Sequence, residues 1–173
     1  MITRPLAVAV FCQFVLLAAI SFGQNSHEHC PQNTSDHDAM MHRGEKGMGF
    51  SQTATEHHFL LKADGGEIAV FAKDPNDTGS RDQIRMHLTH IAHAFSAGDF
   101  DIPMFVHDQE PPGVAVMKRL AKDIRYEFHE TDRGGEVVIS SKSKEAVQAI
   151  HDFLVFQIRE HKTGDPLTDA AKD

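Results

Sequence analysis

Hydrophobic and polar positions alternate in two stretches of the chain, and each stretch is broken by a pair of glycines. The first reads HHFLLKADGGEIAVFAKD, and the second reads IRYEFHETDRGGEVVISSK. Two apolar runs separated by glycines indicate a β-hairpin, because glycine tolerates the positive φ of a tight turn. We therefore predict two hairpins, which turn near Gly65 and near Gly134.

A helical pattern follows each predicted hairpin. After the first hairpin, apolar residues recur at spacings of four, three and four, which places them on one face of a helix: Ile84, Leu88, Ile91 and Phe95. We expect this helix from about Arg81 to Ala97, with Ser80 as its N-cap and Gly98 after its end. In the second half, Ile150 and Leu154 occupy matching positions.

The two halves correspond at nearly constant offsets. Gly134 lies 69 residues after Gly65, and Ile150 lies 66 residues after Ile84. Between the halves, we expect Met104–His107 to be extended and a short helix to start at the two prolines that follow. The predicted fold class is α+β: one antiparallel sheet of four principal strands with helices on one face, built as two ββα repeats joined by a short helix.

The length of 173 residues suits a single domain. Residues 1–23 carry an early arginine, an apolar run and small residues at its end, which is typical of a cleaved signal peptide. An uncleaved anchor helix is the alternative. Cleavage would leave no stable membrane span, so we expect a periplasmic or secreted protein. Residues 24–52 read as a mobile His/Met-rich arm, 53–165 as the duplicated ββα domain, and 166–173 as a tail.

The formal net charge of −8 argues against nucleic acid as a partner, because phosphates would be repelled, and it would mildly attract cations. Cys30 is the one cysteine outside the predicted signal peptide, so no internal disulfide is expected. In an exported protein this residue is a free thiol, an intermolecular bridge or a metal ligand.

The predicted arm is rich in imidazole and sulfur donors, which together suit Cu(I); imidazole also binds Cu(II) and Zn(II). We predict a copper or zinc ion as the bound cofactor. The candidate ligands in the arm are His37, Met40, Met41, His42 and Met48. A solvated linker that happens to be rich in histidine is the alternative interpretation.

The chain shows two resemblances, one carried by the arm and one carried by the domain. Segment 36–42, DHDAMMH, resembles the Met/His-rich segments of exported bacterial copper-resistance proteins, although those proteins usually repeat the unit and this chain has it once. The domain from Gly47 to Asp165 is similar to a group of small exported bacterial proteins of no established activity, through stretches such as MGF, HHFLL and AIHDFLVFQIREHKTGD. The resemblances imply export, one compact domain and copper binding by the arm.

Three further candidate ligands, His87, His90 and His93, recur at spacings of three on the first predicted helix. Each step of three residues drifts by about 60° around a helix, so two neighbours can share a metal ion but all three cannot. His93 is expected to face solvent. Exposed polar helix positions are the alternative explanation for all three.

No catalytic pattern emerges from the sequence. It has no Gly-x-Ser-x-Gly elbow, no phosphate-binding glycine loop and no His-Glu-x-x-His motif. Covalent haem would need Cys-x-x-Cys-His, whereas non-covalent haem remains open. We predict an exported metal-binding protein, copper before zinc, that sequesters or delivers its ion without turnover. The alternative is a binding module that holds a small organic ligand or another exported protein on the sheet or in the groove between the repeats.

Overall fold

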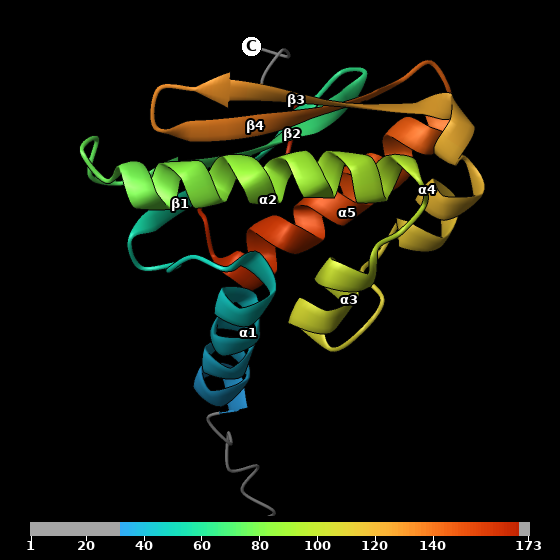
Figure 1. Ribbon diagram of the computed structural model, residues 1–173. Coiled ribbons are helices and arrows are strands. Elements are labelled where there is room, and N and C mark those ends of the chain that lie inside the picture. Colours follow the sequence, from blue (N-terminus) through green and yellow to red (C-terminus); the bar gives the residue numbers. More distant parts are fainter. Residues whose placement is uncertain (1–31, 170–173) are drawn as a thin grey trace, which may run out of the picture. The chain divides into compact units, whose positions relative to one another are not determined.

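The computed structural model describes residues 32–169. The predicted signal peptide, Cys30 and the first residues of the predicted arm lie outside the described residues. The elements of the described part follow one another in this order (Figure 1): α1 (Gln32–Met48), β1 (Thr55–Lys62), β2 (Gly65–Ala72), α2 (Thr78–Ser96), α3 (Asp101–His107), α4 (Val114–Arg119), the short 3₁₀ helix η1 (Ala121–Asp123), β3 (Ile124–Thr131), β4 (Gly134–Ser141) and α5 (Lys144–His161).

The four strands form one antiparallel sheet in the order β1-β2-β4-β3. The two hairpins meet in the middle, where Ile68 of β2 lies opposite Val137 of β4. This arrangement confirms the predicted α+β class and the antiparallel sheet with helices on one face. The elements follow the order ββα twice, while the origin of that order in a duplication stays a prediction.

The two long helices cover the same face of the sheet (Figure 1). Helix α2 packs chiefly on β3 and β4, and α5 packs chiefly on β1 and β2. Each long helix therefore covers the hairpin of the other ββα unit, and neither unit could bury its sheet face alone. The predicted apolar stripes form the core, in which Ile84, Leu88, Ile150 and Leu154 are at most 1% exposed.

Two local predictions were wrong. Helix α2 begins at Thr78 and its N-cap is Asp77, whose Oδ1 accepts a hydrogen bond from the Ser80 backbone N–H at 3.0 Å. Aspartate and serine are similarly good caps, and the more N-terminal one starts the helix here. The segment Met104–His107, expected to be extended, belongs to α3. Pro103 lies in the first turn of α3, where a missing backbone N–H breaks no helical hydrogen bond.

The arm also differs from the prediction, because residues 32–48 form α1. The sequence pattern of this segment is poorly helical, and Gly44 and Gly47 weaken it further. Helix α1 packs against α3, and Met40 on it is only 3% exposed. Tertiary contacts with a segment distant in sequence therefore stabilise a helix that local propensity does not predict.

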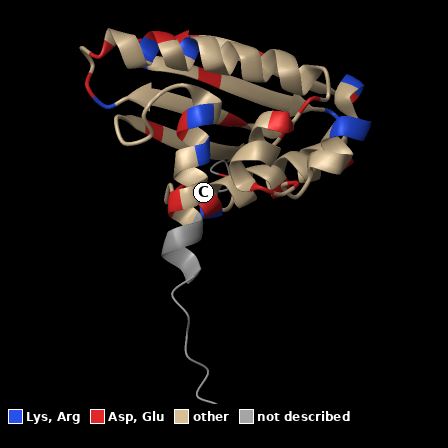
Figure 2. Cartoon of the chain, turned by 60° about the horizontal axis from the view of Figure 1, so that its bottom comes forward, with Lys and Arg blue, Asp and Glu red and all other residues tan. Residues whose placement is uncertain are grey.

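Basic and acidic residues are interspersed along the helices and loops (Figure 2). A membrane-crossing helix would have to be longer and more apolar than any helix found within residues 32–169.

Candidate functional site

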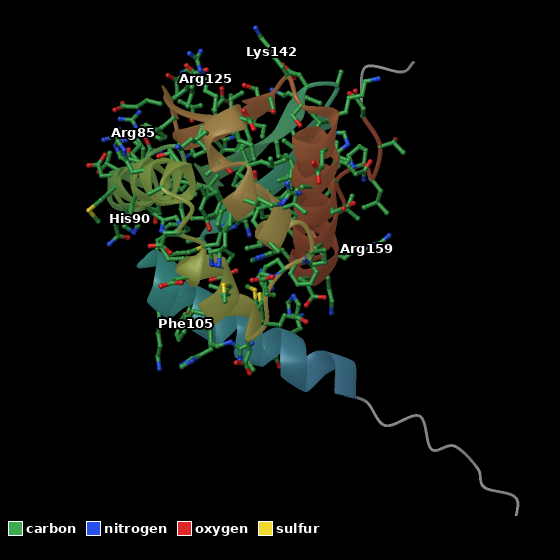
Figure 3. All side chains as sticks on the ribbon, turned by 90° about the vertical axis from the view of Figure 1, so that its right-hand side faces the viewer. Arg85, His90, Phe105, Arg125, Lys142 and Arg159 are labelled. Carbon is green, nitrogen blue, oxygen red and sulfur yellow. The ribbon has the colours of Figure 1, made fainter. Side chains whose placement is uncertain are left out.

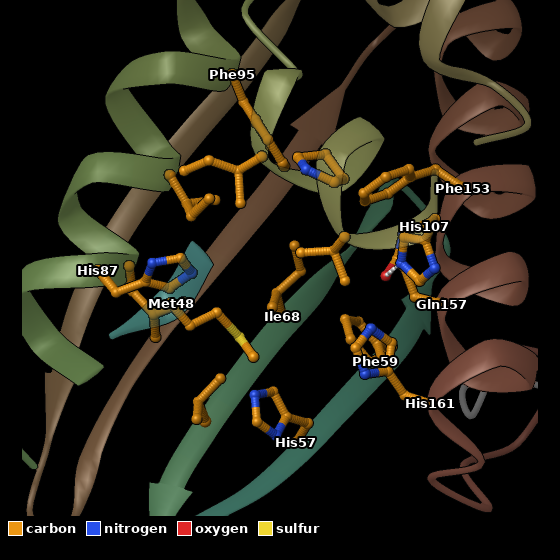
Figure 4. Close-up of a pocket in the computed structure, with 16 residues that line it drawn as sticks. Met48, His57, Phe59, Ile68, His87, Phe95, His107, Phe153, Gln157 and His161 are labelled. Atoms are coloured by element: carbon orange, nitrogen blue, oxygen red, sulfur yellow. Dashed lines mark hydrogen bonds between the residues drawn. The ribbon is translucent and has the colours of Figure 1, made fainter. Parts of the chain in front are cut away.

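A cavity of about 70 Å³ lies between the sheet and the helices, with walls from β1, β2, α1, α2, α3 and α5. Most of the side chains that line it are apolar (Figure 4). The polar ones are four histidines and one glutamine: His57, His87, His107, Gln157 and His161. An apolar cavity with a few converging polar groups is the usual form of a binding site.

Three of these imidazoles are neighbours. The rings of His57 and His161 stack with centroids 5.9 Å apart, and the rings of His107 and His161 meet edge-on at 5.2 Å. His57 comes from β1, His107 is the last residue of α3, and His161 is the last residue of α5. The fold thus brings together three histidines that are far apart in the sequence.

His107 is held in a defined orientation by Gln157. Its Nε2 lies 2.9 Å from Oε1 of Gln157, and both side chains are buried, at 7% and 4% exposure. Because an amide oxygen accepts, Nε2 carries the proton and Nδ1 carries the free lone pair. Within residues 32–169, Nδ1 of His107 is buried and has no hydrogen-bond partner. This is the arrangement in which a second-shell group prepares an imidazole to bind a metal.

His57 presents a second imidazole nitrogen of this kind. Its Nε2 is buried and has no hydrogen-bond partner in the described part of the chain. Phe50 stacks on the ring at 6.0 Å and also meets the ring of His87 edge-on at 5.6 Å. Buried polar atoms without a partner are uncommon in proteins. Within residues 32–169, the side chains of Tyr126, Thr131 and Gln157 carry such an atom as well.

Burial keeps these imidazoles neutral. It lowers the pKa of His57 to about 4, with a further contribution from the charge of His87, and it lowers the pKa of His87 itself to about 4. Burial also lowers the pKa of His107, and together with His57 and His107 it lowers the pKa of His161 well below its usual range. Neutral imidazole is the form that binds metal ions.

The end of α1 adds a sulfur donor. Met48, the last residue of α1, lines the same cavity as the histidines. Figure 4 shows its side chain between His87 and His57, with the thioether directed toward the interior. Nitrogen and soft sulfur donors therefore border one small cavity.

The imidazoles are adjacent but are not assembled around one point. Within residues 32–169, no three side chains of the types His, Cys, Asp and Glu stand together in a geometry that could hold one ion. A metal site here would need the imidazole rings to rotate, and it would include the thioether of Met48, which lies outside that set of residue types.

Asp165 fixes the end of α5 against β1. Its Oδ2 accepts hydrogen bonds from the Phe59 backbone N–H at 2.9 Å and from Thr163 Oγ1 at 2.6 Å, and its Oδ1 lies 2.9 Å from His58 Nδ1. Although burial acts to raise the pKa of Asp165, the hydrogen bonds from Thr163 and His58 lower it. These contacts hold the residues that follow His161 at the end of α5 against the residues that follow His57 on β1.

The structure brings some of the predicted metal ligands to the cavity. Met48 and His87 line it. His37, near the start of α1, lies close enough to His161 for its charge to contribute to the lowered pKa of that residue. Met40 is instead buried at 3% exposure in the packing of α1.

Other predicted ligands lie away from the cavity. Met41 is half-buried, and its carbonyl accepts a hydrogen bond from Gln52 Nε2 at 2.8 Å. His42, His90 and His93 are exposed. Figure 3 shows His90 on the outer side of α2, so the drift around the helix separates it from His87.

The candidate ligands predicted from the sequence did not include four residues that line the cavity: His57, His107, Gln157 and His161. The signal for His161 was present, because at the offset of 66 residues it corresponds to Phe95 of the predicted apolar stripe. A histidine in a stripe position is expected to face the interior. His57 and His107 carried no comparable signal, since their neighbours on the sheet and on α3 depend on the tertiary fold.

Neither the protein-family models nor the curated proteins nor the solved structures contain a match to this chain. The interpretation of the cavity therefore rests on its own geometry and chemistry.

Proposed function

We propose that this protein binds one soft metal ion, Cu(I) before Zn(II), in the cavity, through the imidazoles of His57, His107 and His161 and the thioether of Met48. The proposal is carried by one observation: two buried imidazole nitrogens without partners, on His57 and His107, border the same cavity as a thioether. The ion would be held for sequestration or delivery in an exported protein, as the sequence predicts.

The donor set favours copper in its reduced state. The thioether ligand selects Cu(I), and imidazole suits both copper and zinc; zinc otherwise prefers thiolates and carboxylates in tetrahedral sites. None of the cavity-lining residues in the described part of the chain is acidic or a cysteine. Apolar walls also favour an ion of low charge, because the desolvation penalty of an ion in an apolar environment rises steeply with its charge.

An anaerobic Cu(I) titration of the purified protein against a chromophoric chelator tests the proposal, with Zn(II) titrated in parallel. The variant His161→Phe places in the cavity the residue type that the first ββα unit has at the equivalent position, Phe95. Its matched control, His90→Gln with His93→Gln, removes two exposed histidines of α2. We expect one Cu(I) per chain in the wild type and in the control, and binding weaker by about 100-fold in the cavity variant.

Equal Cu(I) affinity in the wild type and in His161→Phe would contradict the cavity site. If the protein bound Zn(II) more tightly than Cu(I), zinc rather than copper would be the metal of the site. Loss of binding in the control variant with retention in His161→Phe would move the site to the surface of α2.

The apolar lining supports a second candidate, a small apolar ligand. The volume of about 70 Å³ is about half that of the ~150 Å³ cavities that admit benzene, so such a ligand would be smaller than an aromatic ring and far smaller than haem. Absorbance of the purified protein in the Soret region checks for haem directly, and no band is expected.

A further inference from the structure

The segment from Met48 to Phe50 lies against one side of the cavity. Met48 lines it, and the ring of Phe50, which is 4% exposed, lies against His57 at 6.0 Å and against His87 at 5.6 Å. The remaining walls belong to the sheet and to the helices that pack on it or beside it. One donor of the cavity therefore arrives with α1, and the imidazoles arrive with the body of the domain.

Helix α1 is attached beside the cavity by a small set of contacts. Arg43 Nε donates to the carbonyl of Val106 at 2.8 Å, directly before His107. Gly47 packs close to Val106, where a Cβ would lie 3.5 Å from its Cγ2. Gln52 Nε2 donates to the Met41 carbonyl at 2.8 Å and so connects the helix to the segment that follows it.

The contacts of α1 with the rest of the domain also stabilise its helical conformation. Two glycines lower its intrinsic helical stability, and an isolated helix of 17 residues with such a sequence is marginal in water. A Cβ at Gly44 would lie 2.0 Å from Gln52 Nε2, so a larger residue there would displace the side chain that donates to the Met41 carbonyl. Release of α1 from the body is therefore expected to unfold it as well.

We propose that α1 is a metal-linked latch: Cu(I) held between Met48 and the imidazoles stabilises docked α1, and release of α1 withdraws the thioether and opens the cavity. The inference rests on the proposed function. Its physical basis is linkage, since an ion that binds only the docked state shifts the docking equilibrium, and docking raises the affinity for the ion by the same factor.

Hydrogen exchange of the backbone amides of α1, measured on the purified protein with and without stoichiometric Cu(I) under anaerobic conditions, tests the latch. Met48→Leu keeps the volume of the side chain and removes the sulfur. Met41→Leu is the matched control, because that side chain is half-buried on the same helix and does not line the cavity. We expect Cu(I) to slow exchange in α1 by about tenfold or more in the wild type and in Met41→Leu, and not in Met48→Leu.

Without metal, amides of α1 are expected to exchange faster than those of α2, which identifies a local opening. Stoichiometric Cu(I) binding with unchanged exchange in α1 overturns the latch and leaves the metal site standing. The same slowing in Met48→Leu as in the wild type also overturns it. Absence of Cu(I) binding to the wild type removes the proposed function and the latch together.

Discussion

The two edges of the sheet carry ring pairs at corresponding positions, but the rings differ in chemistry and in how they meet. At the β1 edge, the ring of His57 stacks on His161 of α5 with centroids 5.9 Å apart. At the β3 edge, the ring of Tyr126 meets Phe95 of α2 edge-on at 5.9 Å. Tyr126 follows His57 by 69 residues and His161 follows Phe95 by 66, which are the offsets that relate the two ββα units.

The difference lies in the residue types that the two edges carry at corresponding positions. At the β3 edge, Phe95 stacks on Phe100 at 4.3 Å and also contributes to the apolar lining of the cavity. At the β1 edge, imidazoles replace two of the rings and border a cavity that also contains the thioether of Met48. Because the domain packs an aromatic pair at the corresponding positions of the β3 edge, we expect that the fold does not require the two histidines.

The largest effect on Cu(I) affinity is expected when His57 and His161 are replaced together. In His57→Tyr with His161→Phe, the β1 edge receives the residues of the β3 edge. We expect the variant to fold, with circular dichroism like that of the wild type, because the scaffold accommodates this pair already. Its Cu(I) affinity, measured by chelator competition, should fall by at least about 100-fold, since two donors are lost.

Undiminished Cu(I) affinity in a folded exchange variant would show that the difference between the edges has no bearing on metal binding. If the exchange variant does not fold, His161→Phe alone gives the same comparison with a single altered ring.

The second-largest effect is expected from low pH, which should lower the free energy of unfolding through the histidines of the β1 edge. The folded pKa of His57 is about 4 against an ordinary value of 6.5, so the unfolded chain takes up the proton first as the pH falls. The stability that the neutral, buried histidines contribute is present above pH 6.5 and is lost as the pH falls toward 4. A shift of one pKa unit corresponds to about 1.4 kcal/mol, and partial exposure reduces the effect.

Between pH 7 and pH 5, metal-free wild type is therefore expected to lose about 1–2 kcal/mol more unfolding free energy than the exchange variant, in which His57 and His161 are absent. Urea denaturation at the two pH values measures this difference. Equal losses in both proteins would mean that the two imidazoles are not held neutral by burial.

The smallest effect concerns the orientation of His107. Replacing Gln157 by Leu removes the hydrogen bond that leaves Nδ1 unprotonated, and second-shell changes of this kind weaken metal binding by about tenfold. Gln148→Leu, on the exposed side of α5, is the control and should bind as the wild type does. Unchanged Cu(I) affinity in Gln157→Leu would remove His107 from the ligand set while leaving His57 and His161 in it.

Much of the fold could be predicted because its signals are local. Turn glycines mark both hairpins, and the apolar stripe of Ile84 and Leu88 marks α2. Helix α1 could not be predicted, because it is stabilised by α3, more than fifty residues away in the sequence. Helix α3 was mistaken for an extended run, because its proline was taken as a boundary rather than as a first-turn residue.

The candidate site was predictable in part. Sequence composition identified imidazole and thioether donors, and it included Met48 and His87, which line the cavity. The neighbouring pair of His57 and His161 depends on α5 crossing β1, and that follows from the sheet order rather than from any local pattern. In the sequence, the exposed His90 and His93 are as plausible as ligands as His87 is, because spacing alone does not say which side of a helix faces a cavity.

X-ray absorption spectroscopy of the protein loaded with Cu(I), in the wild type and in Met48→Leu, tests the central claim most directly. The account predicts imidazole nitrogen and one sulfur around the copper in the wild type, with the sulfur lost and the imidazoles retained in Met48→Leu. Copper surrounded only by oxygen, or a sulfur shell that persists in Met48→Leu, would contradict it.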